Sequence, residues 1–195
     1  ELIGLLRADG HAIEHVDLGG GLGIPYRSDN NPPPLPDAYA EVVKKHVSGL
    51  DCQVIFEPGR LIAGNAGILV TEVIYLKEGD AKNFVIADAA MNDLIRPTLY
   101  DAYHEIWPVV EAEDGRPEIT ADVVGPVCET GDYLALDRKL ALLSAGAYGA
   151  VQAGTYNSRL LIPEVLVHGE RFHVIRPRRT YDELLGLDSV PDWLT

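Results

Sequence analysis

The order of segments within residues 12–56 constrains the fold more than any other feature of this sequence. Residues 12–18 predict a short buried strand, which leads directly into a glycine-rich run at residues 19–23. Residues 37–48 carry apolar side chains at helical spacing and predict a helix. Residues 53–56 predict a second buried strand. A strand, a glycine loop, a helix and a strand in this order are typical of a β-α-β unit of parallel sheet.

A different pattern begins near residue 66. Short strand-like segments are separated by turns, and they lie at residues 68–76, 84–87, 106–111, 119–124 and 133–136. Residues 164–175 predict a hairpin, and residues 92–104 predict a helix. Such a pattern is typical of an antiparallel β-barrel or sandwich. We therefore expect an α/β plus all-β chain, with residues 1–65 as the α/β region and residues 66–195 as the β-domain.

Charge and composition narrow the class of partner. Asp and Glu number 30 against 16 Lys and Arg, which gives a net charge of -14. Because binding to a phosphate backbone needs a basic face, we expect no nucleic-acid partner. No apolar run approaches the roughly 20 residues that span a bilayer, and Cys52 and Cys128 are too few for a disulfide scaffold. We expect a cytoplasmic setting and no membrane anchor.

The first residues predict a helix that begins near Leu2 and that Gly10 ends. The sequence opens inside this helix, at Glu1 and without an initiator methionine. We therefore expect the chain to be part of a longer protein.

The glycine run is a candidate phosphate cradle, because backbone N–H groups without a nearby Cβ can approach an anion closely. The dinucleotide-binding fingerprint requires a further glycine at position 24, where this sequence has Ile24 followed by Pro25. A nicotinamide-dinucleotide site is therefore disfavoured. A tight turn without a ligand is an equally good interpretation of the run.

Glu57 follows the second predicted strand, at the edge of a parallel sheet where ligands usually bind. A carboxylate buried at such an edge needs a cationic or hydrogen-bonding partner. Arg60 is three residues further on, and an ion pair between the two is the simpler interpretation. The alternative is that Glu57 meets a cofactor ring nitrogen and Arg60 meets an anionic group.

Arg96, Tyr100 and His104 lie at near-helical spacing and would share one face of the helix predicted at residues 92–104. An arginine fork suits a substrate carboxylate, and a tyrosine hydroxyl can add a hydrogen bond. A solvated helix face is the alternative interpretation, and spacing alone favours it.

Two further segments contain groups with possible chemistry. Cys128 and Glu129 follow Gly125-Pro126 and are expected on a turn. An unpaired cysteine is most often a small buried hydrophobic group, but beside a carboxylate on a turn it can donate a proton. Residues 144–149 place small side chains around Tyr148, which suits close approach to a ligand or tight packing. The six histidines form no metal-ligand pattern, so we expect no metal.

Taken together, five segments resemble the diaminopimelate decarboxylases, in chain order. They are Gly19-Gly20-Gly21, Glu57-Pro58-Gly59-Arg60, residues 88–104 (DAAMNDLIRPTLYDAYH), residues 125–132 (GPVCETGD) and residues 145–149 (AGAYG). The resemblance extends to the Pro191-Asp192-Trp193-Leu194 tail. It implies a pyridoxal-phosphate enzyme of fold type III, with an N-terminal (β/α)8 barrel and a C-terminal antiparallel β-barrel or sandwich. The chain would contain the last β/α units of the barrel and the β-domain, and it would form a homodimer with shared active sites.

The resemblance also implies which residues surround the cofactor. Glu57 would keep the pyridine nitrogen protonated, which makes the ring a better electron sink. The residues expected around the cofactor phosphate are Gly20, Gly21, Gly59, Arg60 and Tyr148.

Substrate contacts are implied in the same way. Arg96 and Tyr100 would bind the distal carboxylate of meso-diaminopimelate, and Glu129 its distal amine. Arg60 and Tyr148 would also contact the substrate, while Cys128 of the partner subunit would help to protonate the carbanion left when CO2 departs. Because ornithine has only an amine at its far end, Arg96 favours diaminopimelate as the substrate and L-lysine as the product.

This sequence departs from the family at two places. The cofactor lysine is not found, because none of Lys44, Lys45, Lys77, Lys82 and Lys139 follows a strand in the desolvated setting that a Schiff-base lysine needs. We expect no turnover by this chain alone. Residues 137–143 also lack the proline- and glycine-bearing turn that the family carries.

Two alternatives stay open. One is an ornithine- or carboxynorspermidine-type decarboxylase with the same fold. The other is a non-catalytic β-domain that only dimerises.

Overall fold

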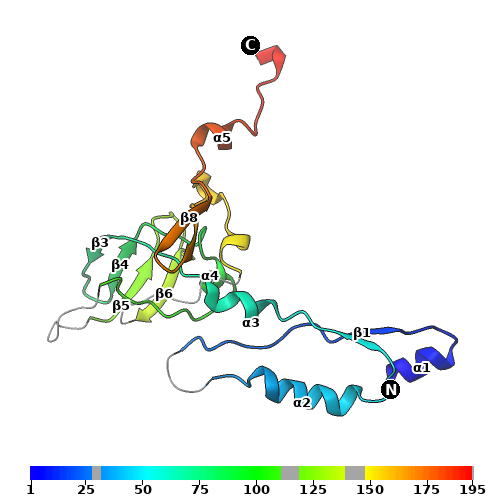
Figure 1. Ribbon diagram of the computed structural model, residues 1–195. Helices are drawn as coiled ribbons and strands as arrows, with labels where there is room; N and C mark the ends of the chain where they lie inside the picture. The colour runs from blue at the N-terminus through cyan, green and yellow to red at the C-terminus, as the bar shows by residue number, and fades with distance from the viewer. Residues whose placement is uncertain (28–31, 111–118, 139–147, 195) are drawn as a thin grey trace. The chain divides into compact units, whose positions relative to one another are not determined.

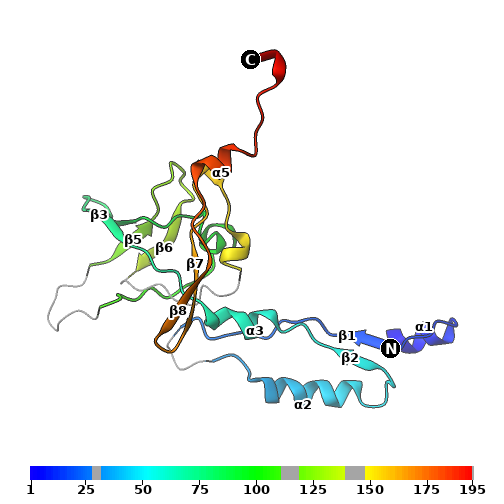
Figure 2. The same ribbon diagram turned by 45° about the horizontal axis from the view of Figure 1, so that its top comes forward.

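The computed structural model describes residues 1–27, 32–110, 119–138 and 148–194. The chain divides into two compact units, with residues 1–68 in the first and the described residues from Leu69 onward in the second. Figures 1 and 2 show the chain from two directions and between them label its α-helices and strands.

The first unit has the predicted β-α-β order. Its elements are α1 (Leu2–Ala8), β1 (His15–Asp17), α2 (Pro36–Val47), β2 (Gln53–Ile55), α3 (Gly59–Ala63) and the 3-10 turn η1 (Gly64–Ala66). Strands β1 and β2 are parallel, with His15 opposite Gln53. The ladder continues beyond the strands, because the Leu18 N–H donates to the Ile55 carbonyl at 3.1 Å. The β-α-β prediction is confirmed, whereas closure into a (β/α)8 barrel stays a prediction.

Local chemistry explains where the elements of this unit begin and end. Pro36 occupies the first turn of α2, where its missing N–H costs no helical hydrogen bond. Gly10 follows the C-terminal end of α1, as predicted. Its φ is 90°, a value that glycine adopts readily because it has no Cβ. Arg7 of α1 donates to the carbonyl oxygens of Ile13 and Leu50 at 2.6 and 2.7 Å, which ties the segments preceding β1 and β2 to the helix.

The second unit contains a four-stranded sheet and a separate hairpin. The sheet has the order β3 (Val73–Lys77), β4 (Asn83–Ala87), β5 (Ala121–Val124) and β6 (Tyr133–Arg138). The hairpin consists of β7 (Glu164–His168) and β8 (Arg171–Arg176), as predicted. The remaining elements are α4 (Arg96–Tyr100), η2 (Ala150–Gln152), η3 (Tyr156–Ser158), α5 (Tyr181–Leu185) and η4 (Asp192–Leu194).

The expected wholly antiparallel arrangement is wrong for one strand pair. Strands β3 and β4 are antiparallel, and so are β5 and β6, but β4 and β5 run parallel. A parallel pair requires a long crossover between its strands. The segment between residues 87 and 121 provides it, and it contains α4.

Two predicted elements differ from the structure. The helix expected at residues 92–104 is reduced to the five residues of α4, because Asp101 takes a left-handed conformation (φ 51°, ψ 33°) and reverses the chain. The strand expected at residues 106–111 does not form in its described part, where Ile106 makes a single bridge and residues 107–110 belong to no strand. Glu111 lies outside the described residues.

The apolar core that the structure describes is concentrated in the second unit. Val85 of β4, Leu134 of β6 and Leu94 before α4 are its largest fully buried side chains. In the first unit, Ile24 and Gly64 are the described residues that are buried. Within the described part of the chain, no helix is both long and apolar enough to cross a membrane.

Candidate active site

The glycine loop of the first unit packs directly against the turn that begins at Glu57. Gly19 accepts a hydrogen bond from the Glu57 N–H at 2.8 Å, and its own N–H donates to the Asp17 carboxylate at 2.8 Å. A Cβ on Gly20 would lie 2.4 Å from the Glu57 carbonyl oxygen. Because a side chain cannot occupy that space, glycine at this position allows the two loops to touch. Gly21 has a φ of 86° and open space around it.

Glu57 and Arg60 lie at the same end of the two parallel strands. Both side chains are exposed, so Glu57 is not the buried carboxylate that the sequence suggested. The Gly59 N–H donates to the Glu57 carbonyl at 2.8 Å, which forms a tight turn before α3. The structure therefore brings Gly20, Glu57, Gly59 and Arg60 to one edge, at the carboxyl ends of the strands, where a phosphate or ring ligand of such sheets binds.

In the second unit, Arg96 contacts His104 rather than lying on a solvated face. Arg96 is 7% exposed and His104 is 2% exposed, and the Arg96 Nη1 lies 3.2 Å from the His104 Nε2. A guanidinium group only donates hydrogen bonds, so His104 Nε2 accepts here. The shared helix face predicted for Arg96, Tyr100 and His104 is wrong, because the reversal at Asp101 returns His104 to Arg96. Tyr100 is 60% exposed and ends α4.

The turn between β5 and β6 carries Cys128 and Glu129. Both side chains are exposed, so the prediction of a turn is confirmed and the interpretation of Cys128 as a buried hydrophobic group is wrong. Hydrogen bonds from the Thr130 hydroxyl and the Gly131 N–H lower the pKa of Glu129 below its ordinary value. Glu129 is therefore an anion at neutral pH and can attract an ammonium group.

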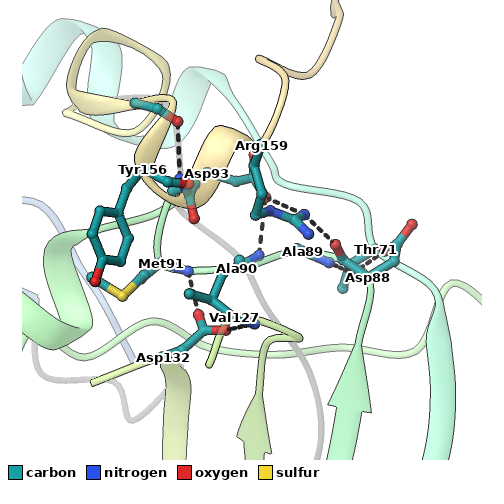
Figure 3. A network of polar contacts seen from close by, with 12 residues as sticks. Thr71, Asp88, Ala89, Ala90, Met91, Asp93, Val127, Asp132, Tyr156 and Arg159 are labelled. Carbon is teal, nitrogen blue, oxygen red and sulfur yellow. Dashed lines mark hydrogen bonds and ion pairs between the residues drawn. The ribbon is translucent and has the colours of Figure 1, made fainter. Parts of the chain in front are cut away.

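Asp132, at the end of the same turn, is a residue to which the sequence gave no role. Its side chain is buried and accepts hydrogen bonds from the N–H groups of Met91 and Val127, each at 2.6 Å. Figure 3 shows this carboxylate between the two backbone segments. An aspartate is seldom buried without partners, and the sequence showed neither the burial of Asp132 nor the groups that it contacts.

The segment that precedes α4 is fixed by further polar contacts, which Figure 3 shows on the side opposite Asp132. Asp93 accepts from the Ala90 N–H at 2.9 Å and lies 3.6 Å from the Arg159 guanidinium. Arg159 also donates to the Asp88 carbonyl at 2.8 Å. Thr71 donates to the Asp88 carboxylate at 2.5 Å and accepts from the Ala89 N–H at 3.0 Å.

Burial affects the two carboxylates of this segment differently. Burial raises the pKa of Asp93, and the hydrogen bond from Ala90 and the charge of Arg159 offset the rise only in part. Burial also acts to raise the pKa of Asp88, but hydrogen bonds from Thr71 and the Glu72 N–H outweigh it and hold this pKa below its ordinary value. Asp88 therefore keeps its negative charge to a lower pH than Asp93 does.

Two residues of the small-residue segment that the sequence singled out are described, Gly149 and, as the residue with possible chemistry, Tyr148. Tyr148 is exposed and has a φ of 60°, an unusual conformation for a non-glycine residue. The rest of that segment up to residue 147, and most of the departure at residues 137–143 including Lys139, lies outside the described residues. Among the residues that are described, no group of three or more His, Cys, Asp and Glu side chains could hold a metal ion.

Comparison with known proteins places these observations in a family context. The family model described as "Pyridoxal-dependent decarboxylase, C-terminal sheet domain" matches residues 15–154. The chain is 48% identical to the diaminopimelate decarboxylase of Zymomonas mobilis, over 100% of this chain and 48% of that protein.

Solved structures agree with the sequence matches. A crystal structure of an Aquifex aeolicus protein aligns with a TM-score of 0.86 and 44% identity, covering 95% of this chain and 48% of the other. The diaminopimelate decarboxylase of M. jannaschii, solved in co-complex with L-lysine, aligns with a TM-score of 0.84 and 35% identity, covering 100% of this chain and 47% of the other. The chain therefore spans about half the length of the relatives it matches.

Proposed function

The chain belongs to the pyridoxal-dependent decarboxylase family, whose C-terminal sheet domain it contains, and from this premise we propose that it forms the C-terminal part of a diaminopimelate decarboxylase. The complete enzyme would convert meso-diaminopimelate to L-lysine and CO2, a step of lysine biosynthesis. Support comes from the 48% identity to an enzyme of that name and from a structural relative solved with L-lysine.

The observation that carries the choice of substrate is the buried arginine of α4. Arg96 is held in place by His104, at 3.2 Å, and the planar fork of an arginine suits the carboxylate of a substrate. Diaminopimelate has a second carboxylate at its far end, and ornithine has none. Arg96, with the exposed Tyr100 hydroxyl at the other end of α4, would therefore bind the distal carboxylate, and Glu129 would bind the distal ammonium group.

The edge of the first unit fits pyridoxal phosphate. Its phosphate would be bound by the backbone at Gly20 and Gly21, by the cation of Arg60 and by the turn at Gly59. The carboxylate of Glu57 suits a protonated ring nitrogen. Tyr148 would also contact the phosphate, and Arg60 and Tyr148 would contact the substrate. When bound, the cofactor supplies an electron sink for the electron pair that remains on the substrate when CO2 departs.

The proton that replaces CO2 needs a donor. Cys128 is exposed on the β5–β6 turn, next to the anion of Glu129. We propose that Cys128 of the partner subunit supplies this proton, in a homodimer with shared active sites. A cytoplasmic location accords with this biosynthetic role.

The chain on its own would not catalyse the decarboxylation. Lys44, Lys45, Lys77 and Lys82 are all exposed, which is unlike the desolvated setting of a lysine that binds a carbonyl cofactor. We infer that the cofactor lysine belongs to the part of the relatives that this chain does not match.

A decarboxylation assay tests the proposal. CO2 release from meso-diaminopimelate and from ornithine, with added pyridoxal phosphate, is compared for this chain and for the full-length protein that carries it. We expect the full-length protein to release CO2 and this chain not to. We also expect the release from diaminopimelate and not from ornithine. In the same protein, Arg96→Ala should lower kcat/KM for diaminopimelate about 10- to 100-fold, the loss of about 1.5–3 kcal/mol from a charged hydrogen bond.

The matched control is Arg171→Ala, which removes an exposed arginine from the start of β8 and should leave kcat/KM unchanged. Arg96→Ala without effect would contradict the distal-carboxylate argument and favour an ornithine- or carboxynorspermidine-type enzyme. A full-length protein that forms dimers but releases no CO2 from either substrate would favour a non-catalytic β-domain.

A further inference from the structure

We infer that Asp132 is a positioning residue, which fixes the turn carrying Cys128 and Glu129 against the segment that leads to Arg96. The inference rests on the proposed function for the roles of these three groups. The geometry itself does not depend on that function. The Asp132 carboxylate contacts none of the three side chains and acts on them through the backbone.

The Asp132 carboxylate joins two backbone segments that are far apart in sequence. Its Oδ1 accepts from the Met91 N–H at 2.6 Å, and its Oδ2 accepts from the Val127 N–H at 2.6 Å. The side chain lies in the interior, since Asp132 is 3% exposed. Hydrogen bonds from N–H groups to a buried carboxylate are short and strong, so each oxygen holds one segment firmly.

The backbone of Asp132 also closes the β5–β6 turn on itself. Its carbonyl accepts from the Gly125 N–H at 3.0 Å, and its N–H donates to the Glu129 carbonyl at 3.1 Å. Val127 and Glu129, the two neighbours of Cys128, are therefore both bonded to Asp132. Cys128 itself points outward and is exposed.

Gly125 leaves room for this arrangement. A Cβ at this position would lie 2.4 and 2.6 Å from the two Asp132 carboxylate oxygens and 2.7 Å from the Ala90 Cα. The end of β5 thus approaches both the carboxylate and the segment 88–93 more closely than any residue with a side chain could.

The same turn is tied to α4, the helix that carries Arg96. Thr98 donates its hydroxyl to the Gly131 carbonyl at 2.5 Å, and the Tyr133 hydroxyl donates to the Pro97 carbonyl at 3.2 Å. The carboxylate of Asp132 and these two bonds therefore connect the helix that carries Arg96 with the turn whose Cys128 is proposed to act in the site of the partner subunit. Such rigid support is what a precisely arranged site requires.

A carboxylate is specifically suited to this position. Both of its oxygens accept, whereas an asparagine has one accepting oxygen and an NH2 group that would face an N–H. Asp132→Asn should therefore lose one of the two connections, and Asp132→Ala should lose both. Because Asp132→Asn keeps the side-chain volume and Asp132→Ala does not, a comparison of the two variants separates the loss of positioning from the loss of volume.

The first arm of the test uses the 195-residue chain and no activity measurement. Cys52→Ser leaves Cys128 as the single thiol, to which a nitroxide spin label is attached. We expect the electron spin resonance lines of the label to be narrower in Asp132→Asn than in the parent, because the turn becomes more mobile, and narrower still in Asp132→Ala. The control is Asp122→Asn, which changes another buried carboxylate, 4% exposed and 2.7 Å from Lys82 Nζ, but one that lies within β5.

The second arm measures decarboxylation in the full-length protein. We expect Asp132→Ala to lower kcat about 10²-fold, the scale of a misplacement of about 1 Å. Asp132→Asn should give an intermediate kcat, and Asp122→Asn should match the parent. Melting temperatures of all variants show whether Asp132→Asn and Asp122→Asn destabilise the fold equally, which a merely structural role for both would predict.

The outcomes separate the two proposals. Narrower lines and a lower kcat in Asp132→Asn, with neither change in Asp122→Asn, support the positioning role. Unchanged lines in Asp132→Asn would overturn it, and so would an unchanged kcat in an active enzyme. If the full-length protein releases no CO2 from diaminopimelate before any substitution, the proposed function fails, and the spin-label arm alone decides whether Asp132 holds the turn.

Discussion

Gly20 illustrates how a single missing Cβ positions the proposed cofactor site. We expect Gly20→Ala to destabilise the chain by about 1–3 kcal/mol, because the added carbon would lie 2.4 Å from the Glu57 carbonyl oxygen and the backbone would have to move. Urea unfolding of the chain measures this change. Gly59→Ala is the control, since a Cβ there meets nothing within 4 Å, and it should be neutral or slightly stabilising. Equal effects of the two substitutions would contradict the close approach of the loops.

Asp93 gives a pH-dependent prediction at the same scale. Burial raises its pKa in the folded chain above the ordinary 3.8, so the folded state retains its proton at pH values where the unfolded state has lost it. The contribution of Asp93 to stability is therefore most favourable below pH 3.8 and is lost as the pH rises through the folded pKa.

Replacement by asparagine removes this titration. We expect the free energy of unfolding of the parent to increase relative to that of Asp93→Asn as the pH falls from 7 toward 3.8. Asp88, whose pKa is lowered, changes stability in the opposite direction and is present in both proteins. Urea titrations at a series of pH values give the difference directly. A difference that stays constant, or that falls toward acid pH, would show that the pKa of Asp93 is not raised.

Among the elements, those that sequence predicted best are defined by local patterns. The β-α-β order of the first unit and the hairpin β7–β8 both follow from periodicity and turn residues. The pairing of β4 with β5 could not be predicted in the same way, because strand direction within a sheet is set by the crossover and leaves no local signal. The helix at residues 92–104 was overestimated because the left-handed turn at Asp101 has no glycine to mark it.

The candidate site shows the same division. Sequence motifs indicated the glycine loop, Glu57, Arg96 and the Cys128-Glu129 turn. They gave no indication that Asp132 bonds to Met91, 41 residues away, or that Arg159 bonds to the Asp88 carbonyl, 71 residues away. Such long-range partners are determined by packing, so they could not be predicted from spacing.

On the scale of the whole molecule, the uneven core predicts how the chain opens. The described buried apolar residues lie in the second unit, apart from Ile24, so the first unit has little burial to oppose local unfolding. Proteases cleave segments that open, and cleavage follows the population of the open form. We therefore expect brief protease treatment of this chain to cut within residues 1–68 first and to leave a fragment that begins near Leu69.

Mass spectrometry of the digest identifies that fragment, and the matched comparison is the full-length protein. If residues 1–68 complete a barrel there, as proposed, the remaining strands would cover the exposed side chains of Ile55, Phe56 and Ile62 and protect the same sites. Equal cleavage in both proteins would mean that this unit does not join a barrel. Cleavage that removes the second unit while residues 1–68 survive would contradict the link between the buried core and resistance, because the sheet β3–β6 holds most of the described core.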